Sequence, residues 1–212
     1  MNDFLIIDKP EGWTSHDVVA KLRGLLKERK IGHLGTLDPL ATGVLVVAVG
    51  RAQTKQISQY MKLDKEYEVE MELGKLSDTY DREGKSEETG FDLSKLNKKT
   101  VQETVESFWG KSMQTPPAFS AKKIHGKKAY ELARAGKPVE LKPVEVEMEG
   151  IGEIEVDFPF VRFTVKVSSG TYIRSLVHDI GEKLDCGALL TQLRRTRVGP
   201  FKLENAKALE DF

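Results

Sequence analysis

The sequence lacks the features that mark a membrane-spanning or disulfide-stabilised protein. It has one cysteine, Cys186, so no disulfide can form within the chain, and a reducing cytoplasm is its simplest location. The longest apolar run is Val44 to Val49, whereas a spanning helix needs about 20 residues. The stretch from Met1 to Ile7 has no basic flank and too short an apolar core for a secretory signal. We therefore expect a cytoplasmic protein that does not enter a membrane.

The sequence also has no net charge, because 33 basic residues balance 33 acidic ones. Total charge therefore indicates neither nucleic acid nor a membrane surface as a partner. Locally, basic residues outnumber acidic ones in Lys21 to Lys30, Lys111 to Lys142 and Arg194 to Lys207, whereas Glu145 to Asp157 holds six acidic residues and no basic one. Such segregation is typical of a site for an anionic polymer, and solvated charges scattered over the surface are the alternative that charge alone leaves open.

With 212 residues, 39% of them hydrophobic, the chain can bury a sizeable core, and we expect one domain over residues 1–212. Short strands are predicted at Phe4–Asp8, Val44–Val49, Lys65–Leu73, Val144–Met148 and Phe163–Val167. Helices are predicted after a Ser15 cap, after a Thr100–Glu103 capping box, at Ala129–Ala135, from Gly170 to near Gly187, and at Asn205–Phe212. Because strands and helices do not alternate regularly, the pattern favours an α+β fold with a mixed, mainly antiparallel sheet.

The stretch Lys65 to Leu73 alternates inward and acidic positions, which predicts a strand with one wet face and Tyr67 on the inward face. The following stretch, Gly74 to Gly90, is polar and acidic and is expected to be a loop. The basic stretch Lys111 to Lys142 is expected to be an excursion of loop, short helix and loop between two strands.

The most unusual segment runs from Gly32 to Gly43, where glycine and proline exclude a regular helix. Glycine lets a backbone approach a ligand closely, and two polar side chains, His33 and Asp38, lie between the glycines. Asp38 precedes Pro39, which biases Asp38 to an extended conformation that displays its side chain. A turn-forming Asp-Pro, and a loop histidine with satisfied hydrogen bonds, are the plain alternatives.

A second candidate is Arg174, which follows Gly170 in the first turn of a predicted helix. An arginine is electrostatically misplaced there, because that end of a helix carries a partial positive charge. An acidic partner would remove the misfit. Arginine binds a carboxylate through two parallel hydrogen bonds, so Arg174 facing Asp38 would hold an ionised carboxylate in one pose.

Six blocks of motifs, in order along nearly the whole chain, resemble the TruB family of pseudouridine synthases. The blocks are Asp8-Lys9-Pro10 with Gly12 and Thr14 to Asp17; Gly32 to Gly43; Asp64 to Tyr67; Leu73-Gly74 with Asp78, Thr79 and Asp81; Pro116-Pro117 with Ser120-Ala121; and Gly170 to Arg174 with Leu193-Arg194-Arg195. Each block alone is of moderate specificity, and their order gives the resemblance its weight. It implies a pseudouridine synthase fold, in which helices flank the sheet and the catalytic cleft lies across it.

The resemblance implies an enzyme that isomerises uridine 55 in the T-loop of tRNA to pseudouridine, without a cofactor or a metal. It assigns Asp38 as the nucleophile, Tyr67 as the tyrosine that stacks on the base and takes the C5 proton, and Arg174 as the partner of the aspartate. The chemistry agrees, because a base must be flipped out to react and an aromatic ring can hold it by stacking. A carboxylate nucleophile suffices for this internal exchange, and attack at uracil C6 or assistance at ribose C1′ both remain open.

The resemblance also implies residues that bind the substrate. His33 matches a histidine that contacts the flipped nucleotide, and Tyr172 and Leu193 match residues that line the uracil pocket. Lys9 matches a basic residue of the first motif. An RNA-gripping insertion is expected at about residues 111–143. The side chains expected to contact RNA are Lys122, Lys123, Lys127, Lys128, Arg194 and Arg195.

The chain departs from the family pattern in two ways. Ser77 stands where many members have threonine, and the chain stops at Phe212 without the C-terminal RNA-binding (PUA) domain of many bacterial members. We expect tRNA, bound through its T-arm, as the partner, with no membrane and no obligate protein partner.

Three other functions are compatible with parts of the sequence. A metal-dependent hydrolase is disfavoured because the residues available lack a compact ligand spacing: His16, Asp17, His33 and Asp38. A non-catalytic RNA-binding protein or tRNA-folding chaperone would use the same cleft and basic segment, whereas the three catalytic candidates favour an enzyme. A guide-RNA-dependent enzyme of the dyskerin type is disfavoured by the lack of extensions for accessory partners.

Overall fold

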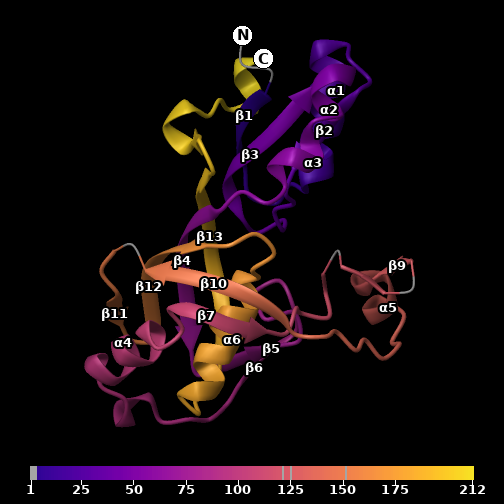
Figure 1. The fold of residues 1–212 in the computed structure, drawn as a ribbon. Coiled ribbons are helices and arrows are strands. Elements are labelled where there is room, and N and C mark those ends of the chain that lie inside the picture. The colour runs from indigo at the N-terminus through magenta and orange to yellow at the C-terminus, as the bar shows by residue number, and fades with distance from the viewer. Residues whose placement is uncertain (1–3, 121, 125, 151) are drawn as a thin grey trace. The chain divides into compact units, whose positions relative to one another are not determined.

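The computed structural model describes residues 4–120, 122–124, 126–150 and 152–212, and the chain divides into two compact units (Figure 1). Unit 1 comprises Met1–Glu68, Val165–Ser169 and Gln192–Phe212, and unit 2 comprises Val69–Thr164 and Gly170–Thr191. Three strands therefore supply residues to both units: β4 (Lys65–Leu73), β12 (Phe160–Val167) and β13 (Ala188–Val198). The single domain predicted for residues 1–212 stays a prediction.

The remaining elements fall within one unit each. Unit 1 contains β1 (Phe4–Lys9), α1 (Ser15–Leu26), β2 (Ile31–Leu34), β3 (Thr42–Val49), α2 (Arg51–Thr54), α3 (Ile57–Tyr60), β14 (Phe201–Lys202) and the 3₁₀ turns η2 (Leu203–Asn205) and η3 (Leu209–Asp211). Unit 2 contains β5 (Lys75–Ser77), β6 (Ser86–Glu88), η1 (Leu93–Lys95), α4 (Lys98–Glu106), β7 (Gly110–Gln114), β8 (Lys123–Ile124), β9 (Lys127–Lys128), α5 (Ala129–Arg134), β10 (Val144–Gly150), β11 (Glu155–Asp157) and α6 (Ile173–Lys183).

The main sheet is mixed and mostly antiparallel, as the sequence predicted. Its strands are hydrogen-bonded in the order β1-β3-β13-β4-β12-β10-β7, with β2 on β3, β14 on β13 and β11 on β12. Strands β3 and β13 pair in parallel. Antiparallel pairs include β1 with β3, β2 with β3, and β7 with β10.

Strand β3 is apolar along its length because both of its faces are buried, which confirms the prediction for Val44 to Val49. On one face, Leu45 and Val47 lie in a core cluster with the buried residues of α1. On the other face, the alternate residues of β3 pack with Val198 of β13. The core of unit 1 therefore holds β3 between α1 and β13, and the loop that precedes β3 is fixed at its end.

Helix α1 is capped by Thr14, so the prediction that Ser15 is its cap is wrong. Thr14 Oγ1 accepts a hydrogen bond from Asp17 N at 3.1 Å, and the Asp17 carboxylate accepts one from Thr14 N at 2.9 Å. This reciprocal pair satisfies backbone donors that a helix start leaves free. Ser15 is instead buried, and its hydroxyl binds the backbone of Leu37.

Three other expectations about local structure are corrected. Helix α4 is capped by Asn97, whose side chain accepts from Thr100 N at 2.9 Å, so the cap lies three residues before the predicted one. The segment Gly32 to Gly43 is not wholly a loop, because β2 and β3 enter it from both ends. The helix predicted at Asn205–Phe212 is replaced by short 3₁₀ turns.

Several segments gain structure that the sequence did not indicate. The stretch Lys111 to Lys142, predicted as loop, short helix and loop, also contains most of strand β7 and a short hairpin of β8 with β9. The predicted loop from Gly74 to Gly90 contains a hairpin in which β5 pairs with β6. Strand β13 was not predicted. In the described part of the chain, no helix has both the length and the apolar character needed to cross a membrane.

Candidate active site

The loop that carries Asp38 joins β2 to β3 in unit 1. Ala41 N donates to Asp38 O at 3.1 Å, which closes a turn around Asp38, and Gly12 N donates to Pro39 O at 2.9 Å. Side chains from three other elements also bind the backbone of this loop: Lys9 at the end of β1, Ser15 in α1 and Arg195 in β13. The backbone around Asp38 is thus anchored, and the display of the Asp38 side chain stays a prediction.

Lys9 is buried, with none of its surface exposed. Its ammonium donates to Pro39 O at 3.2 Å, to Trp13 O at 2.6 Å and to Pro10 O at 2.8 Å. These bonds tie the turn after β1 to the residue that follows Asp38. The contacts support a structural role in the loop, and direct binding of substrate by Lys9 stays a prediction.

Ser15 binds the residue that precedes Asp38 on both of its backbone groups. Its Oγ accepts from Leu37 N at 2.8 Å and lies 3.2 Å from Leu37 O, to which it donates. The start of α1 therefore fixes the peptide unit next to Asp38.

Arg195, for which the sequence predicted contact with RNA, is buried in unit 1, and that contact stays a prediction. One per cent of its surface is exposed, and its guanidinium donates to the backbone oxygens of Gly35, Thr36 and Val44. Arg195 is part of the support of the Asp38 loop.

Tyr67 lies on the inward face of β4 and is 6% exposed, as the alternating pattern predicted. Lys65 is two residues earlier on the same face, and its ammonium donates to Leu63 O at 2.6 Å. Burial, followed by the positive charge of Arg195, lowers the pKa of Lys65 to about 8, and the Asp64 carboxylate acts in the opposite direction.

His33 is in β2, opposite Val47 of β3. Burial lowers the pKa of His33, and the positive charges of Arg195 and His16 lower it further. The imidazole is therefore neutral at neutral pH and can act as both donor and acceptor. Its contact with the flipped nucleotide stays a prediction.

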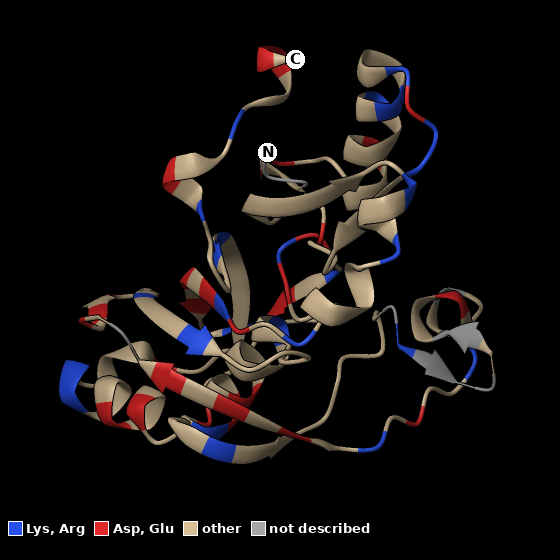
Figure 2. Ribbon diagram, turned by 45° about the horizontal axis from the view of Figure 1, so that its top comes forward, with Lys and Arg blue, Asp and Glu red and all other residues tan. Residues whose placement is uncertain are grey.

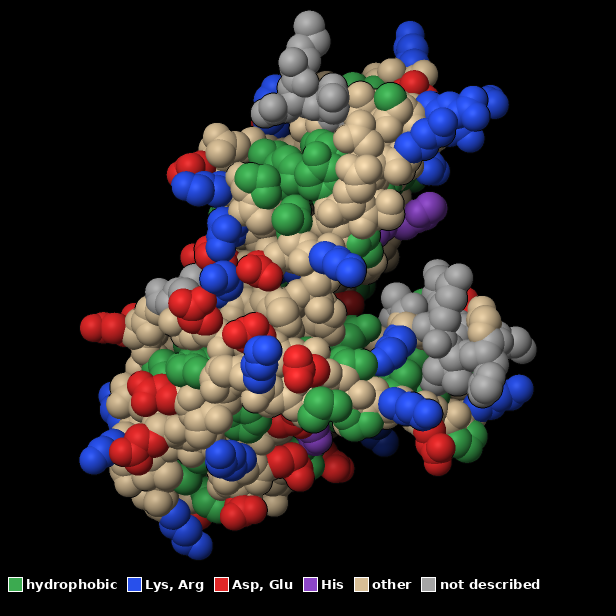
Figure 3. Space-filling model, viewed as in Figure 1, with side chains coloured by type: hydrophobic (Ala, Val, Ile, Leu, Met, Phe, Trp, Pro, Cys, Tyr) green, Lys and Arg blue, Asp and Glu red, His purple; other side chains and the backbone are tan. Residues whose placement is uncertain are grey.

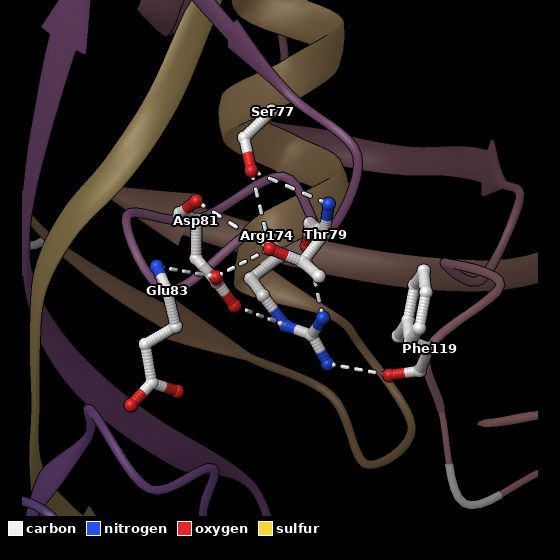
Figure 4. A network of polar contacts seen from close by, with 6 residues as sticks. All are labelled: Ser77, Thr79, Asp81, Glu83, Phe119 and Arg174. Carbon is white, nitrogen blue, oxygen red and sulfur yellow. Dashed lines mark hydrogen bonds and ion pairs between the residues drawn. The ribbon is translucent and has the colours of Figure 1, made fainter. Parts of the chain in front are cut away.

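In unit 2, Arg174 is the centre of a buried polar network (Figure 4). Its Nη1 donates to Thr79 O at 2.9 Å, and its Nη2 donates to Phe119 O at 2.8 Å. Its Nε lies 3.6 Å from Asp81 Oδ2, and these two side chains are 6% and 5% exposed. Asp81 is an acidic partner of the kind that the sequence predicted for Arg174.

Asp81 is itself held in place. Its Oδ1 accepts from Thr79 Oγ1 at 2.6 Å and from Glu83 N at 3.0 Å (Figure 4). Asp81 belongs to one of the motif blocks, but the sequence did not indicate its role. The signal that could have found it is the need of Arg174, at a helix start, for a negative partner.

Gln114 is a second residue that sequence reasoning missed. Its side-chain amide accepts from Tyr172 N at 2.8 Å and donates to Tyr172 O at 3.0 Å. Because Tyr172 is the N-cap of α6 and has no side-chain cap bond of its own, this buried glutamine fixes the start of the helix that carries Arg174. The part of Tyr172 in a uracil pocket stays a prediction.

Asp38 belongs to unit 1 and Arg174 to unit 2. Their predicted pairing therefore stays a prediction. Leu193, predicted to line the pocket, is 7% exposed and belongs to unit 1.

The other basic residues expected to contact RNA are described in part. Arg194 is partly exposed, and it donates to Asp8 at 2.7 Å and to Thr42 Oγ1 at 3.2 Å. Lys122 is half-buried. The side chains of three further candidates lie outside the described part of the structure: Lys123, Lys127 and Lys128.

Charged side chains gather at two places on the described surface. Figure 2 shows acidic residues along β10, where Glu145, Glu147 and Glu149 are exposed. Basic side chains project from the surface near the end of α1 (Figure 3), where Lys27 and Arg29 are exposed.

The residues considered for a metal site are not gathered into one. Among the described residues, no group of three or more histidine, cysteine or acidic side chains is placed to hold a metal ion. Asp17 is engaged in the cap of α1, where it accepts from Thr14 Oγ1 at 2.6 Å.

Two family models match the chain. The model described as TruB family pseudouridylate synthase (N terminal domain) matches residues 23–173. The model described as tRNA pseudouridylate synthase B C-terminal domain matches residues 174–212.

Similar curated proteins cover nearly the whole chain. It is 48% identical over 210 residues to tRNA pseudouridine synthase B of Geobacter sulfurreducens, which covers 99% of this chain and 68% of that protein. It is 46% identical over 216 residues to tRNA pseudouridine synthase B of Chloroherpeton thalassium, which covers 99% of this chain and 88% of that protein.

Solved structures with a similar fold include larger chains. A crystal structure of a Cbf5-Nop10-Gar1 complex matches with a TM-score of 0.74 and 32% identity, over 98% of this chain and 52% of that chain. A structure of an H/ACA RNP bound to a substrate RNA containing 2′-deoxyuridine matches with a TM-score of 0.70 and 31% identity, over 98% of this chain and 51% of that chain. The chain thus spans about half the length of these two solved chains.

Proposed function

The chain belongs to the TruB family of pseudouridylate synthases and is an isomerase that forms pseudouridine in tRNA; from that premise we propose that its target is uridine 55 in the T-loop. The resemblance of six motif blocks supports this position. The fold is the pseudouridine synthase fold, with a mixed, mostly antiparallel sheet.

The proposed reaction exchanges one glycosidic bond for another. The bond from ribose C1′ to uracil N1 breaks, a bond from C1′ to C5 forms, the C5 proton leaves and N1 gains a proton. The product is an isomer of the substrate, so no atom has to be supplied. Uridine within a folded T-loop hides these atoms, and the nucleotide must therefore be flipped into the site.

Asp38 is the proposed nucleophile. The observation that carries this assignment is the support of its loop by Lys9, Ser15 and Arg195, because a nucleophile reacts fast only if its pose is fixed before the substrate arrives. Attack at ribose C1′ and attack at uracil C6 both fit this arrangement.

Tyr67 is proposed to stack on the flipped base and to accept the C5 proton. Its place on an inward strand face supports the stacking role, since an aromatic ring there presents a flat apolar surface to the uracil. Arg174 is proposed to orient the Asp38 carboxylate. The bonds of Arg174 to Thr79 and Phe119 fix the plane of its guanidinium, which supports that role.

The experiment is to incubate the protein alone with an unmodified tRNA transcript and to map pseudouridine along the RNA. We expect modification at position 55. We expect Asp38→Asn to bind the RNA while its turnover falls by at least about 1,000-fold, because the amide keeps the shape and loses the nucleophile. Pseudouridine at another position would exclude uridine 55 as the target, and turnover of Asp38→Asn within tenfold of the wild type would exclude Asp38 as the nucleophile.

A guide-RNA-dependent function is the second candidate, because the two solved relatives are parts of larger assemblies. The curated relatives support the independent enzyme more strongly, since their identity to this chain is 46–48% against 31–32%. The same incubation separates the two candidates. Modification by the protein alone supports the independent enzyme, and a requirement for added RNA or protein supports the second candidate.

A further inference from the structure

Arg195 has an unusual environment for an arginine. Among the described residues it is the largest side chain that is fully buried. It forms no ion pair in the described part of the chain, although burying a charged group without a partner of opposite charge is costly. An apolar residue of similar volume would fill the same space at lower cost. Filling space therefore does not explain why a charged guanidinium is buried at this position.

The guanidinium binds the backbone on both sides of Asp38, at the start of the Asp38 loop and in strand β3 just after it. Before Asp38, Nη2 donates to Gly35 O at 3.1 Å and Nη1 lies 3.5 Å from Thr36 O. After Asp38, Nε donates to Val44 O at 2.7 Å. Because the guanidinium is planar and its donors have fixed directions, these bonds set the separation of the two ends of the loop.

The backbone of Arg195 is also fixed against this loop. Arg195 pairs with Gly43 in the parallel ladder between β13 and β3. A Cβ at Gly43 would lie 2.2 Å from Arg195 O, and Gly43 has a φ of +94°, so only glycine fits. Strands β3 and β13 therefore approach each other closely at the backbone of Arg195, which fixes where its side chain begins.

Gly35, whose carbonyl binds Arg195, also packs against a second buried cation, Lys65. A Cβ at Gly35 would be 3.6 Å from Arg195 Nη1 and 3.7 Å from Lys65 Cε. Lys65 is two residues before Tyr67 on the inward face of β4. Gly35 thus packs between the arginine that holds the Asp38 loop and the strand that carries Tyr67.

We propose that Arg195 is a positioning residue for Asp38: its guanidinium holds the two ends of the loop and so sets the pose of the Asp38 carboxylate, without contacting RNA. The proposal rests on the proposed role of Asp38 as nucleophile. It predicts that loss of the planar fork lowers the rate of the chemical step and leaves RNA affinity unchanged.

The test is Arg195→Lys, which keeps the charge and removes the fork. We expect the single-turnover rate on a T-arm transcript to fall about 100-fold, the loss that follows from a misplacement of about 1 Å, while the Kd for the same RNA stays within about threefold. The matched control is Arg197→Lys, two residues along β13, because Arg197 binds Glu66 and Gly199 O and not the Asp38 loop. The control should stay within about twofold in rate.

A second measurement does not depend on activity. Hydrogen exchange of amides in residues 35–41 should be faster in Arg195→Lys than in the wild type, whereas exchange in α6 should be unchanged. If Arg195→Lys does not fold, Arg195→Gln is measured in the same way, because it is neutral and keeps two donors. If uridine 55 is not the target, the exchange result still tests the loop.

Two results would overturn the proposal. A rise in Kd as large as the fall in rate would show that Arg195 acts on RNA binding. Unchanged exchange in residues 35–41, together with a rate within threefold of the wild type, would show that the loop does not depend on the guanidinium.

Discussion

Three buried polar residues of unit 1, Lys9, Ser15 and Arg195, use their side chains on backbone groups of one short loop. A loop without ladder partners leaves carbonyls and amides to be satisfied, and side chains from the neighbouring elements satisfy them here. The same bonds remove the freedom of the loop before substrate binds. Reorganisation is then avoided during the reaction, which favours catalysis.

Tyr67→Phe tests the two proposed roles of the tyrosine separately. The phenyl ring keeps the stacking surface, so the Kd for a T-arm hairpin should stay within about threefold. The hydroxyl is lost, so the single-turnover rate should fall by roughly 100-fold or more, as expected for loss of a general base. Rate and affinity are measured on the same RNA. An equal loss of both would assign Tyr67 to binding alone.

The lowered pKa of Lys65 predicts how the free energy of unfolding depends on pH. Its pKa falls from 10.5 to about 8 on folding, so between these values the unfolded chain holds a proton that the folded chain has released. The free energy of unfolding should therefore rise with pH across this window. Relative to Lys65→Met, which has no such group, we expect the wild type to gain roughly 1 to 2 kcal/mol between pH 7.5 and 10.

The measurement is denaturant unfolding of both proteins at a series of pH values. Subtracting Lys65→Met from the wild type removes the other lysines and tyrosines that titrate in the same range. A difference that is flat, or that falls with pH, would show that Lys65 is not a buried cation in solution.

The sequence indicated single candidate residues of the site. It did not indicate the buried residues that hold them in place. Asp38, Tyr67 and Arg174 were each proposed from local pattern and resemblance, and their roles stay predictions. The burial of Arg195 was not predicted, because its carbonyl partners are about 150 residues away in the sequence, and an arginine in an alternating stretch is typical of a solvent face. Asp81 was missed for a similar reason, since its partner is more than 90 residues away.

At the scale of elements, the N-terminus of helix α1 has two structural roles. Its capping box starts the helix, and Ser15, the first residue after the cap, holds Leu37 beside Asp38. The position of the Asp38 loop therefore depends on where the helix begins.

Thr14→Ala removes the cap of α1 and should lower the free energy of unfolding by about 1 kcal/mol. It should also lower kcat several-fold, because the start of α1 is where Ser15 binds the loop. The control is Asn97→Ala, which removes the equivalent cap of α4 in unit 2. Asn97→Ala should lower the free energy of unfolding by a similar amount and leave kcat unchanged. Equal kcat values for the two variants would show that the cap of α1 does not affect the Asp38 loop.

Elements with clear periodicity were predicted well, and those whose pattern is set by distant partners were not. Strand β4 has the predicted bounds because its two faces differ in polarity at every step. Strand β13 was missed because its inward face includes Arg195, which breaks the apolar alternation. The cap of α4 was displaced because two polar residues, Asn97 and Thr100, each fit a cap, and only the structure shows that the asparagine is used.

At the scale of the whole molecule, the chain is neutral and its basic residues are concentrated in a few stretches of the sequence. Affinity for tRNA should therefore come from few basic segments, and each neutralised phosphate contributes roughly 0.7 to 0.9 to the slope of log K against log salt. We expect Lys127→Gln with Lys128→Gln to weaken binding and to reduce this slope by about 1.4 to 1.8. The control pair, Lys98→Gln with Lys99→Gln on the exposed start of α4, should leave the slope unchanged.

The same titrations on a T-arm hairpin show where these contacts lie on the RNA. If they lie on the T-arm, the hairpin should be modified with a kcat/KM within about tenfold of full tRNA, a difference of about 1.4 kcal/mol in transition-state binding. A hairpin hundreds of times worse would place essential contacts elsewhere on the tRNA.

The three shared strands constrain how a gene for this chain can be divided. The backbone passes between units 1 and 2 four times, at residues 68–69, 164–165, 169–170 and 191–192, so no single break separates the units. A break in the segment after β4 would leave each polypeptide with part of both units. Recombination cannot exchange unit 1 as a module in the way that it exchanges domains joined end to end. Two such fragments would regain activity only by assembling with each other, as in a split-protein complementation pair.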